Sequence, residues 1–162
     1  LQCVPEKFAR MFRLRIVRLN RNLIESLPKR IGRLDKLEVL ELSVNSLTEL
    51  PESICSLKYL RKLMLNKNDI GAWPCSISRM TSLEILSLNQ NRLREMPKDI
   101  WQLPNLRDLR MAYNRIKDLG EAFGQGPLST SLETLWMMGN RLQELPLSVS
   151  KLVALKSIFF QQ

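Results

Sequence analysis

The sequence predicts an α/β solenoid, a curved right-handed superhelix with a parallel β-sheet on its concave face and short 3₁₀ or α turns on its convex face. Six asparagines, from Asn22 to Asn140, recur at intervals of 23 residues, with one interval of 26. Each closes the phrase L-x-x-L-x-L-x-x-N-x-L, and five are followed by a proline-containing phrase related to L-P-x-x-I-x-x-L. A fixed period of this length is typical of solenoids, whose stacked units share one core because no unit can bury its apolar face alone.

The L-x-x-L-x-L portion of each unit predicts a short strand. Its apolar residues alternate at period two, so the leucines point inward and the intervening residues point outward. We expect seven such strands, stacked in parallel about 4.8 Å apart. The asparagine then turns the chain, and its amide should bond the backbone of adjacent turns. The proline that follows suits the first position of a 3₁₀ or short α turn, and Trp73 fills a leucine position there as a core residue.

The repeating frame covers the whole chain as a single domain, and we expect the chain to be a slice of something longer. The partial repeats are 1–13 and 155–162, and the complete ones are 14–36, 37–59, 60–82, 83–105, 106–131 and 132–154. In the repeat 106–131, Gly120 replaces the proline and three extra residues rich in Gly, Pro and Ser predict a convex loop. Such a loop is either a contact site or a tolerated insertion.

Composition limits the cellular setting. The three cysteines are odd in number and lack metal-type spacing, and no asparagine lies in an N-x-S/T acceptor. We therefore expect structural thiols in a reducing, intracellular compartment, most simply the cytoplasm, with an organelle left open. Charges interrupt every apolar stretch before the roughly 20 residues that a membrane span requires.

The net charge of +9 is concentrated at one end, because residues 1–36 hold ten Lys and Arg against three acidic residues. A basic end attracts acidic protein surfaces or phosphate backbones. The alternative is a solvated flank that acidic repeats elsewhere would balance.

Two charged columns recur through the repeats. The residue after the first leucine of each strand alternates in sign, which predicts a ladder of cross-strand pairs that stabilises the register. This column holds Arg15, Glu38, Arg61, Glu84, Arg107, Glu133 and Lys156. A second column follows the asparagines, and we expect acids three residues further on to neutralise its arginines. The second column holds Arg92, Arg115 and Arg141, and the acids are Glu95, Asp118 and Glu144.

With these motifs, the chain resembles the leucine-rich repeat proteins. The 23-residue unit with L-P-x-x-I-x-x-L is similar to the intracellular Ras-group type found in Scribble, Erbin, Densin and the plant Ras-group repeat proteins. The resemblance covers essentially all of the chain, although the matching positions are structural ones. It implies a leucine-rich repeat solenoid that acts as a curved, non-catalytic platform and binds other proteins through its concave face.

The residue inventory argues against catalysis. The chain has no histidine, and it contains neither G-x-G-x-x-G nor the G-x-x-x-x-G-K-S/T phosphate loop. Its cysteines lack a partner base, and its acidic residues are spread one or two per repeat. We therefore expect no enzyme activity, no cofactor, no metal site and no small-molecule substrate.

The outward strand positions predict a site for a protein partner. Aromatic, Met and Arg side chains gather near the C-terminal end, which is the composition of interface hot spots. Basic residues on the other half fit an acidic segment of the partner. The predicted contact residues are Arg18, Arg21, Glu41, Lys62, Met64, Lys67, Asp108, Arg110, Tyr113, Trp136, Met138 and Phe159.

Three alternatives stay open at this point. A missing C-terminal repeat or the segment 124–131 could fold over Trp136 and Phe159. The basic end could bind RNA in a ribonucleoprotein or another large complex. The chain could also be the recognition arm of a larger signalling enzyme.

Overall fold

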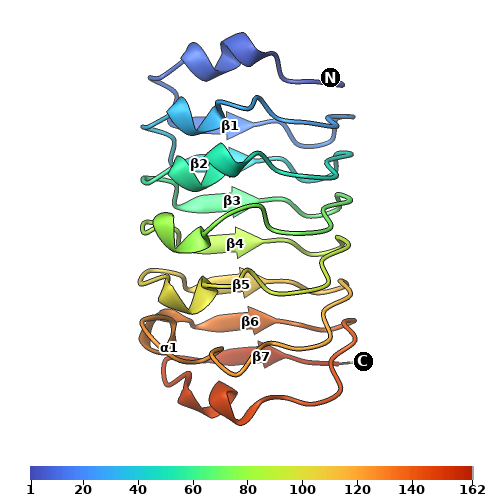
Figure 1. Ribbon diagram of the computed structural model, residues 1–162, viewed down its shortest axis with the longest axis vertical. Helices are drawn as coiled ribbons and strands as arrows, with labels where there is room; N and C mark the ends of the chain where they lie inside the picture. Colours follow the sequence, from blue (N-terminus) through green and yellow to red (C-terminus); the bar gives the residue numbers. More distant parts are fainter. Residues whose placement is uncertain (162) are drawn as a thin grey trace.

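The computed structural model describes residues 1–161 and confirms the predicted solenoid. Figure 1 shows coils stacked along one long axis, with the two termini toward opposite ends of the stack. Seven parallel strands form one open sheet in which spatial order follows chain order. The strands are β1 (Ile16–Arg18), β2 (Val39–Glu41), β3 (Lys62–Met64), β4 (Ile85–Ser87), β5 (Asp108–Arg110), β6 (Thr134–Trp136) and β7 (Ser157–Phe159).

Strand register follows the sequence repeat. Leu40 of β2 pairs with Leu63 of β3, and Leu63 pairs with Leu86 of β4. These middle residues are buried, whereas their strand neighbours face solvent at least in part or lie against other surface side chains. A shift of one residue would turn this leucine row outward, so burial of the row fixes the register.

The repeat asparagines form a hydrogen-bonded ladder along the core, as predicted. The Asn91 side-chain amide donates to the carbonyl oxygens of Leu65 and Leu88 at 2.9 and 3.1 Å, and its Oδ1 accepts from the Ile70 N–H at 3.0 Å. Asn68 in the preceding repeat and Asn114 in the following repeat make the same three kinds of hydrogen bond to the backbone around them. Each asparagine thus pairs backbone groups that the turns bury, in two successive repeats.

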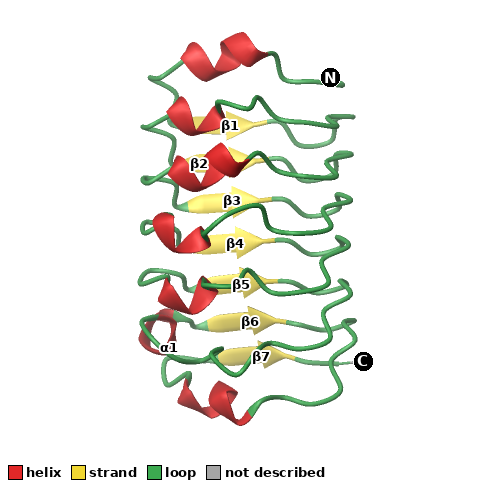
Figure 2. Cartoon of the chain, viewed as in Figure 1, coloured by secondary structure: helices red, strands yellow, loops and turns green. Residues whose placement is uncertain are grey.

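Short helices follow the turns on the convex side (Figure 2). Three of them begin directly after Pro5, Pro51 and Pro146, whose φ angles of −67°, −69° and −62° suit a helical start. The 3₁₀ helices are η1 (Glu6–Arg10), η2 (Ile31–Arg33), η3 (Glu52–Ser56), η4 (Ile77–Arg79), η5 (Ile100–Gln102) and η6 (Leu147–Lys151), and one α-helical turn is α1 (Leu128–Ser131).

The insertion in the fifth repeat, within 124–131, contributes to the core through Leu128, which is fully buried. Phe123 just before it is also fully buried, at the position where the preceding repeat carries Ile100. Gly124 has a φ of +89°, and a Cβ atom there would lie 2.0 Å from the Ser148 carbonyl oxygen, so only glycine fits. The Ser131 hydroxyl reaches the Leu103 carbonyl oxygen on the same convex side. The insertion therefore packs between convex turns, and the idea that it covers the aromatic residues of the sheet is wrong.

The cysteines differ from the expectation of three thiols. Cys55 in η3 and Cys75, 20 residues later, form a disulfide that joins the convex turns of two successive repeats. Cys3 remains free and exposed. The spacing of Cys55 and Cys75 in the sequence did not indicate this disulfide, because the two residues meet only when successive repeats stack.

The alternating charge ladder forms only as separate pairs. Glu38 contacts Arg15 at 3.4 Å, and Glu84 contacts Arg61 at 2.7 Å. Lys156 similarly contacts Glu133 at 2.7 Å. Among residues 1–161, no ion pair links Glu38 to Arg61, so the predicted continuous ladder is correct in sign and register but not in its pairing.

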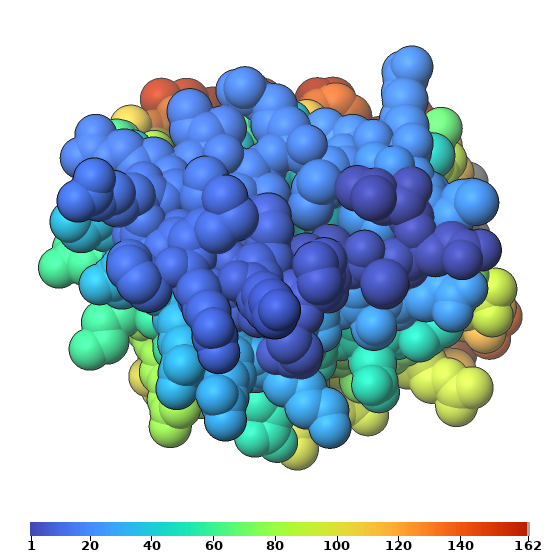
Figure 3. Space-filling view, turned by 90° about the horizontal axis from the view of Figure 1, so that it is seen from above, coloured from blue at the N-terminus to red at the C-terminus, as the bar shows by residue number. Residues whose placement is uncertain are grey.

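The N-terminal segment lies across one end of the stack. Figure 3 looks down the long axis and shows this segment in dark blue over the end of the solenoid. The Cys3 strand bridge to Ser26 continues the repeat geometry into the segment. None of the helices in the described residues has the length and apolar character that crossing a bilayer needs.

Candidate protein-binding site

The outward strand residues form three columns on the solvent-facing side of the sheet, which we call the concave face. Strand register places Arg110 beside Trp136, and Trp136 beside Phe159. The central column holds Arg18, Glu41, Met64, Ser87, Arg110, Trp136 and Phe159, as predicted.

Trp136 and Phe159 form the aromatic cluster of the concave face. Their ring centroids are 4.0 Å apart with an interplanar angle of 21°, and the Arg110 guanidinium lies 5.7 Å from the Trp136 ring centroid. Phe159 is 37% exposed, and Trp136 is half-buried. Stacked aromatic rings beside an arginine combine apolar area with a fixed orientation, which suits an interface anchor.

Asp108 fixes the position of Arg110. The Arg110 Nε atom donates to Asp108 Oδ1 at 3.1 Å, and Nη2 donates to Asp108 Oδ2 at 2.6 Å. These hydrogen bonds, opposed by burial, raise the pKa of Arg110 above its ordinary value. Asp108 and Arg110 therefore form a single bidentate unit, and Asp108 cannot bind a partner cation without loosening Arg110.

Tyr113 and Met138 border the aromatic cluster. Tyr113 is 55% exposed and has a left-handed φ of 56°. A Cβ atom at Gly139 would lie 2.5 Å from the Tyr113 ring, so the missing side chain lets the ring pack over the next repeat. Met138 is half-buried beside Gly139. Together with Trp136 they extend the apolar area toward the edge of the sheet.

The other half of the concave face centres on Glu41. Its carboxylate contacts Arg18 at 3.4 Å and accepts hydrogen bonds from Lys62 and Asn20 at 3.0 Å each. Burial raises the pKa of Glu41, but the hydrogen bonds from Lys62 and Asn20 and both positive charges outweigh it and lower the pKa. Arg18 and Lys62 thus share one carboxylate within the chain, which offsets only one of their two positive charges.

Three further predicted residues lie around this network. Arg21 and Lys67 are exposed at the turns after β1 and β3, with left-handed φ angles of 57° and 55°. Neither forms an ion pair within residues 1–161. Met64 is half-buried between Glu41 and Ser87 in the central column.

Sequence reasoning missed a second asparagine row on the concave face. Asn20 accepts a hydrogen bond from the Ser43 N–H at 2.8 Å, Asn66 from the Asn89 N–H at 3.0 Å, and Asn89 from the Ala112 N–H at 2.8 Å. These side chains hold neighbouring repeats together. The signal was an asparagine two residues before the repeat asparagine in three units.

The cation column after the repeat asparagines is not neutralised as predicted. Arg92 contacts Asp69 of the preceding repeat at 2.7 Å instead of Glu95. Within residues 1–161, Arg115 and Arg141 form no ion pair.

Five of the ten basic residues in 1–36 gather on the convex side. A hollow of about 500 Å³ is lined by Lys7, Arg10, Lys29, Arg30 and Arg33 together with Glu6 and Ala9. The Glu6 carboxylate accepts the Lys29 backbone N–H at 2.8 Å. This charge lies away from the concave face and cannot steer a ligand directly onto the aromatic cluster.

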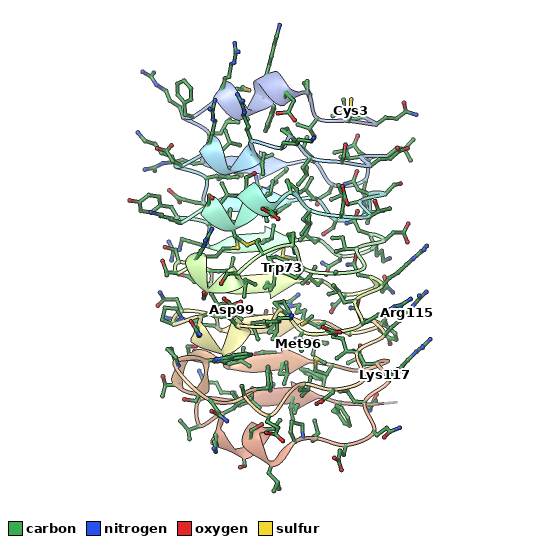
Figure 4. The ribbon with its side chains drawn as sticks, viewed as in Figure 1. Cys3, Trp73, Met96, Asp99, Arg115 and Lys117 are labelled. Atoms are coloured by element: carbon green, nitrogen blue, oxygen red, sulfur yellow. A yellow bond between two sulfur atoms is a disulfide. The ribbon has the colours of Figure 1, made fainter. Side chains whose placement is uncertain are left out.

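Trp73 is a packing residue, as predicted. It is half-buried against the core, and Figure 4 shows it in the middle of the stack near Met96 and Asp99. Its indole Nε1 is buried without a hydrogen-bond partner among the described residues.

Solved structures of other proteins share this fold. A leucine-rich repeat protein of Leptospira interrogans is 30% identical, with a TM-score of 0.70 over 100% of this chain and 47% of that one. An internalin of Listeria monocytogenes is 23% identical, with a TM-score of 0.85 over 99% of this chain and 45% of that one. A plant peptide hormone receptor in complex with RGF2 is 22% identical, with a TM-score of 0.81 over 99% of this chain and 30% of that one.

The chain spans less than half the length of each of these three proteins. None of the curated proteins compared with it matches. The sequence profile of the family described as a leucine-rich repeat region matches residues 2–125. The chain therefore belongs to the leucine-rich repeat family.

Proposed function

We propose that the chain is a non-catalytic scaffold that binds a protein partner on its concave face. The stacked Trp136 and Phe159 would anchor the partner, and the Asp108–Arg110 unit would orient it. The observation that carries the proposal is an aromatic pair held in one geometry by an arginine while Phe159 stays partly exposed. Exposed aromatic area of this kind marks interaction surfaces.

The fold supports this proposal. The plant receptor that shares it was solved in complex with RGF2. Seven in-register strands give a ligand a long wall of side chains on rigid elements, and such placement makes a binding geometry precise.

Site-directed photo-crosslinking tests the location of binding. A photo-reactive amino acid placed at Met138 should capture one specific protein in cells of the source organism. The matched control places the same group at Lys58, just after η3, and should not capture that protein. A partner captured only from Lys58 would contradict the proposal.

The captured partner then allows a quantitative test. Phe159→Ala should weaken its binding by roughly 2 kcal/mol, measured by isothermal titration calorimetry, because the anchor loses half of its stacked pair. Val153→Ala removes another exposed apolar side chain outside the concave face and should leave the affinity unchanged.

We also propose that the chain is of the intracellular Ras-group repeat type, which its 23-residue unit supports. The Cys55–Cys75 disulfide argues against an intracellular location, because such bonds persist mainly in oxidising compartments. Thiol titration of the chain, isolated from cells under denaturing, acid-quenched conditions, tests the intracellular location. Three reactive thiols would support an intracellular location, and a single reactive thiol at Cys3 would contradict it.

A further inference from the structure

We propose that the chain has a second docking surface, which binds an acidic segment of a protein. This surface, the cationic edge, comprises Arg94, Arg115, Lys117 and Arg141 in the turns that follow β4, β5 and β6. It lies beyond Tyr113 and outside the concave face. Its evidence is therefore independent of the aromatic cluster.

The four cations surround one hollow. Together with Glu95 and Asp118 they line a groove of about 500 Å³. Backbone hydrogen bonds hold its walls together: the Arg115 N–H donates to the Leu93 carbonyl at 2.8 Å, and the Arg141 N–H donates to the Ile116 carbonyl at 2.9 Å. Figure 4 shows the Arg115 and Lys117 side chains projecting outward from the same side of the stack.

These cations carry charge that the rest of the chain does not neutralise. All four are exposed, and the part of the chain spanning 1–161 offers none of them an ion pair. Elsewhere the chain stacks opposite charges, as in Arg92 with Asp69 and Arg61 with Glu84. Like charges in adjacent repeats repel one another, so this edge is less favourable alone than with an anion bound.

The two acids in the groove do not cancel the cations. Asp118 accepts the Gly120 N–H at 2.8 Å, which directs one carboxylate oxygen to its own turn. Glu95 forms no ion pair within the described residues. Their presence nevertheless selects among ligands, because a continuous phosphate backbone would bring further negative charge against both carboxylates.

A polypeptide fits the groove better than nucleic acid. It can place carboxylates opposite Arg115 and Lys117 and present backbone N–H groups to Glu95 and Asp118. The groove also lacks an aromatic lining on which bases could stack. Charge complementarity thus favours an acidic protein segment.

Fluorescence anisotropy with a labelled oligoglutamate peptide tests this surface on the intact chain at low ionic strength. Arg115→Glu/Lys117→Glu should weaken binding roughly tenfold, because two attractive charges become repulsive. Lys58→Glu/Arg79→Glu changes the net charge equally at exposed convex positions and should weaken binding less than about twofold. Unchanged melting temperatures would show that both variants fold.

Several results would overturn the proposal. One is a lack of saturable oligoglutamate binding by the unmodified chain, and another is an equal loss in the two variants. A greater loss in Lys29→Glu/Arg33→Glu would place the binding on the N-terminal basic residues instead. Tighter binding of oligouridylate than of oligoglutamate would identify a nucleic-acid surface. Trp136→Ala should leave oligoglutamate binding unchanged, which separates this surface from the proposed concave site.

Discussion

The side chain of each repeat asparagine provides the hydrogen-bond partners that buried backbone groups lack at the tight turn. Asn91 is 7% exposed and serves two carbonyl oxygens and one N–H from two repeats. A leucine of similar size would increase the apolar content of the core but leave those three groups buried without partners. Position in the repeat, rather than hydrophobicity, therefore decides which residue is tolerated.

Asn91→Leu should lower the free energy of unfolding by roughly 3 kcal/mol or more, because each orphaned backbone group costs about 1–3 kcal/mol. Chemical denaturation measures this change. Gln102→Leu, at an exposed position of η5, is the control and should stay within about 0.5 kcal/mol of the parent chain. Equal stability of the two variants would contradict the role of the ladder.

Glu41 should make stability depend on pH. Its pKa is lowered in the folded chain, so its contribution is fully present above the ordinary glutamate pKa of about 4.3 and is lost as the pH falls through the folded value. Glu41→Gln should therefore show a smaller loss of stability between neutral and acidic pH in urea titrations. Parallel pH profiles for Glu41→Gln and the parent chain would argue against this linkage.

These residue roles differ in how far the sequence predicts them. The repeat asparagines are predictable because their position is fixed relative to the leucines. Pairings such as Arg92 with Asp69 are not, since side chains on adjacent repeats are 23 residues apart in sequence and several acids are within reach. The same ambiguity hid the pairing of both Arg18 and Lys62 with Glu41.

At the scale of elements, the strands and turns follow from the spacing of apolar residues, but the insertion in the fifth repeat does not. Its Gly, Pro and Ser content predicts a surface loop, and yet Leu128 is buried and α1 forms within it. Phe123, by contrast, stands 23 residues after Ile100 in the repeating frame, so its burial follows from the period. A composition-based prediction cannot show that Leu128 fills space between convex turns. That space is created only by the stacking of the neighbouring repeats.

Phe123→Ala should destabilise the chain by about 3–5 kcal/mol, as expected when a fully buried aromatic side chain is removed. Gln125→Ala, two residues later and exposed, should have little effect. Thermal unfolding followed by circular dichroism compares them. A small effect of Phe123→Ala would contradict a packing role for this position of the repeat.

Reduction of the disulfide should lower stability by about 3 kcal/mol, because the bond closes a loop of 20 residues and restricts the unfolded chain. Cys55→Ala/Cys75→Ala should unfold at the temperature of the reduced chain and should not respond to reductant. An unchanged unfolding temperature on reduction would contradict the stabilising role of this bond.

The whole molecule is a stack in which each repeat contacts its neighbours, so local errors of prediction leave the architecture intact. Fold, strand number and the members of each concave column follow from the period alone. Only the structure shows that the insertion does not cover Trp136 and Phe159, because its packed position between convex turns cannot be predicted from its composition. In our proposals, the concave face supplies an aromatic anchor for a protein partner, and the cationic edge supplies positive charge for an acidic segment.

Calorimetric titration of the photo-captured partner into the parent chain and into Trp136→Ala tests whether the partner binds the concave face. We expect Trp136→Ala to weaken binding by roughly 2 kcal/mol or more, at low and at high salt alike, while the variant still unfolds cooperatively. Undiminished affinity in a folded Trp136→Ala variant would show that the concave face is not where the partner binds.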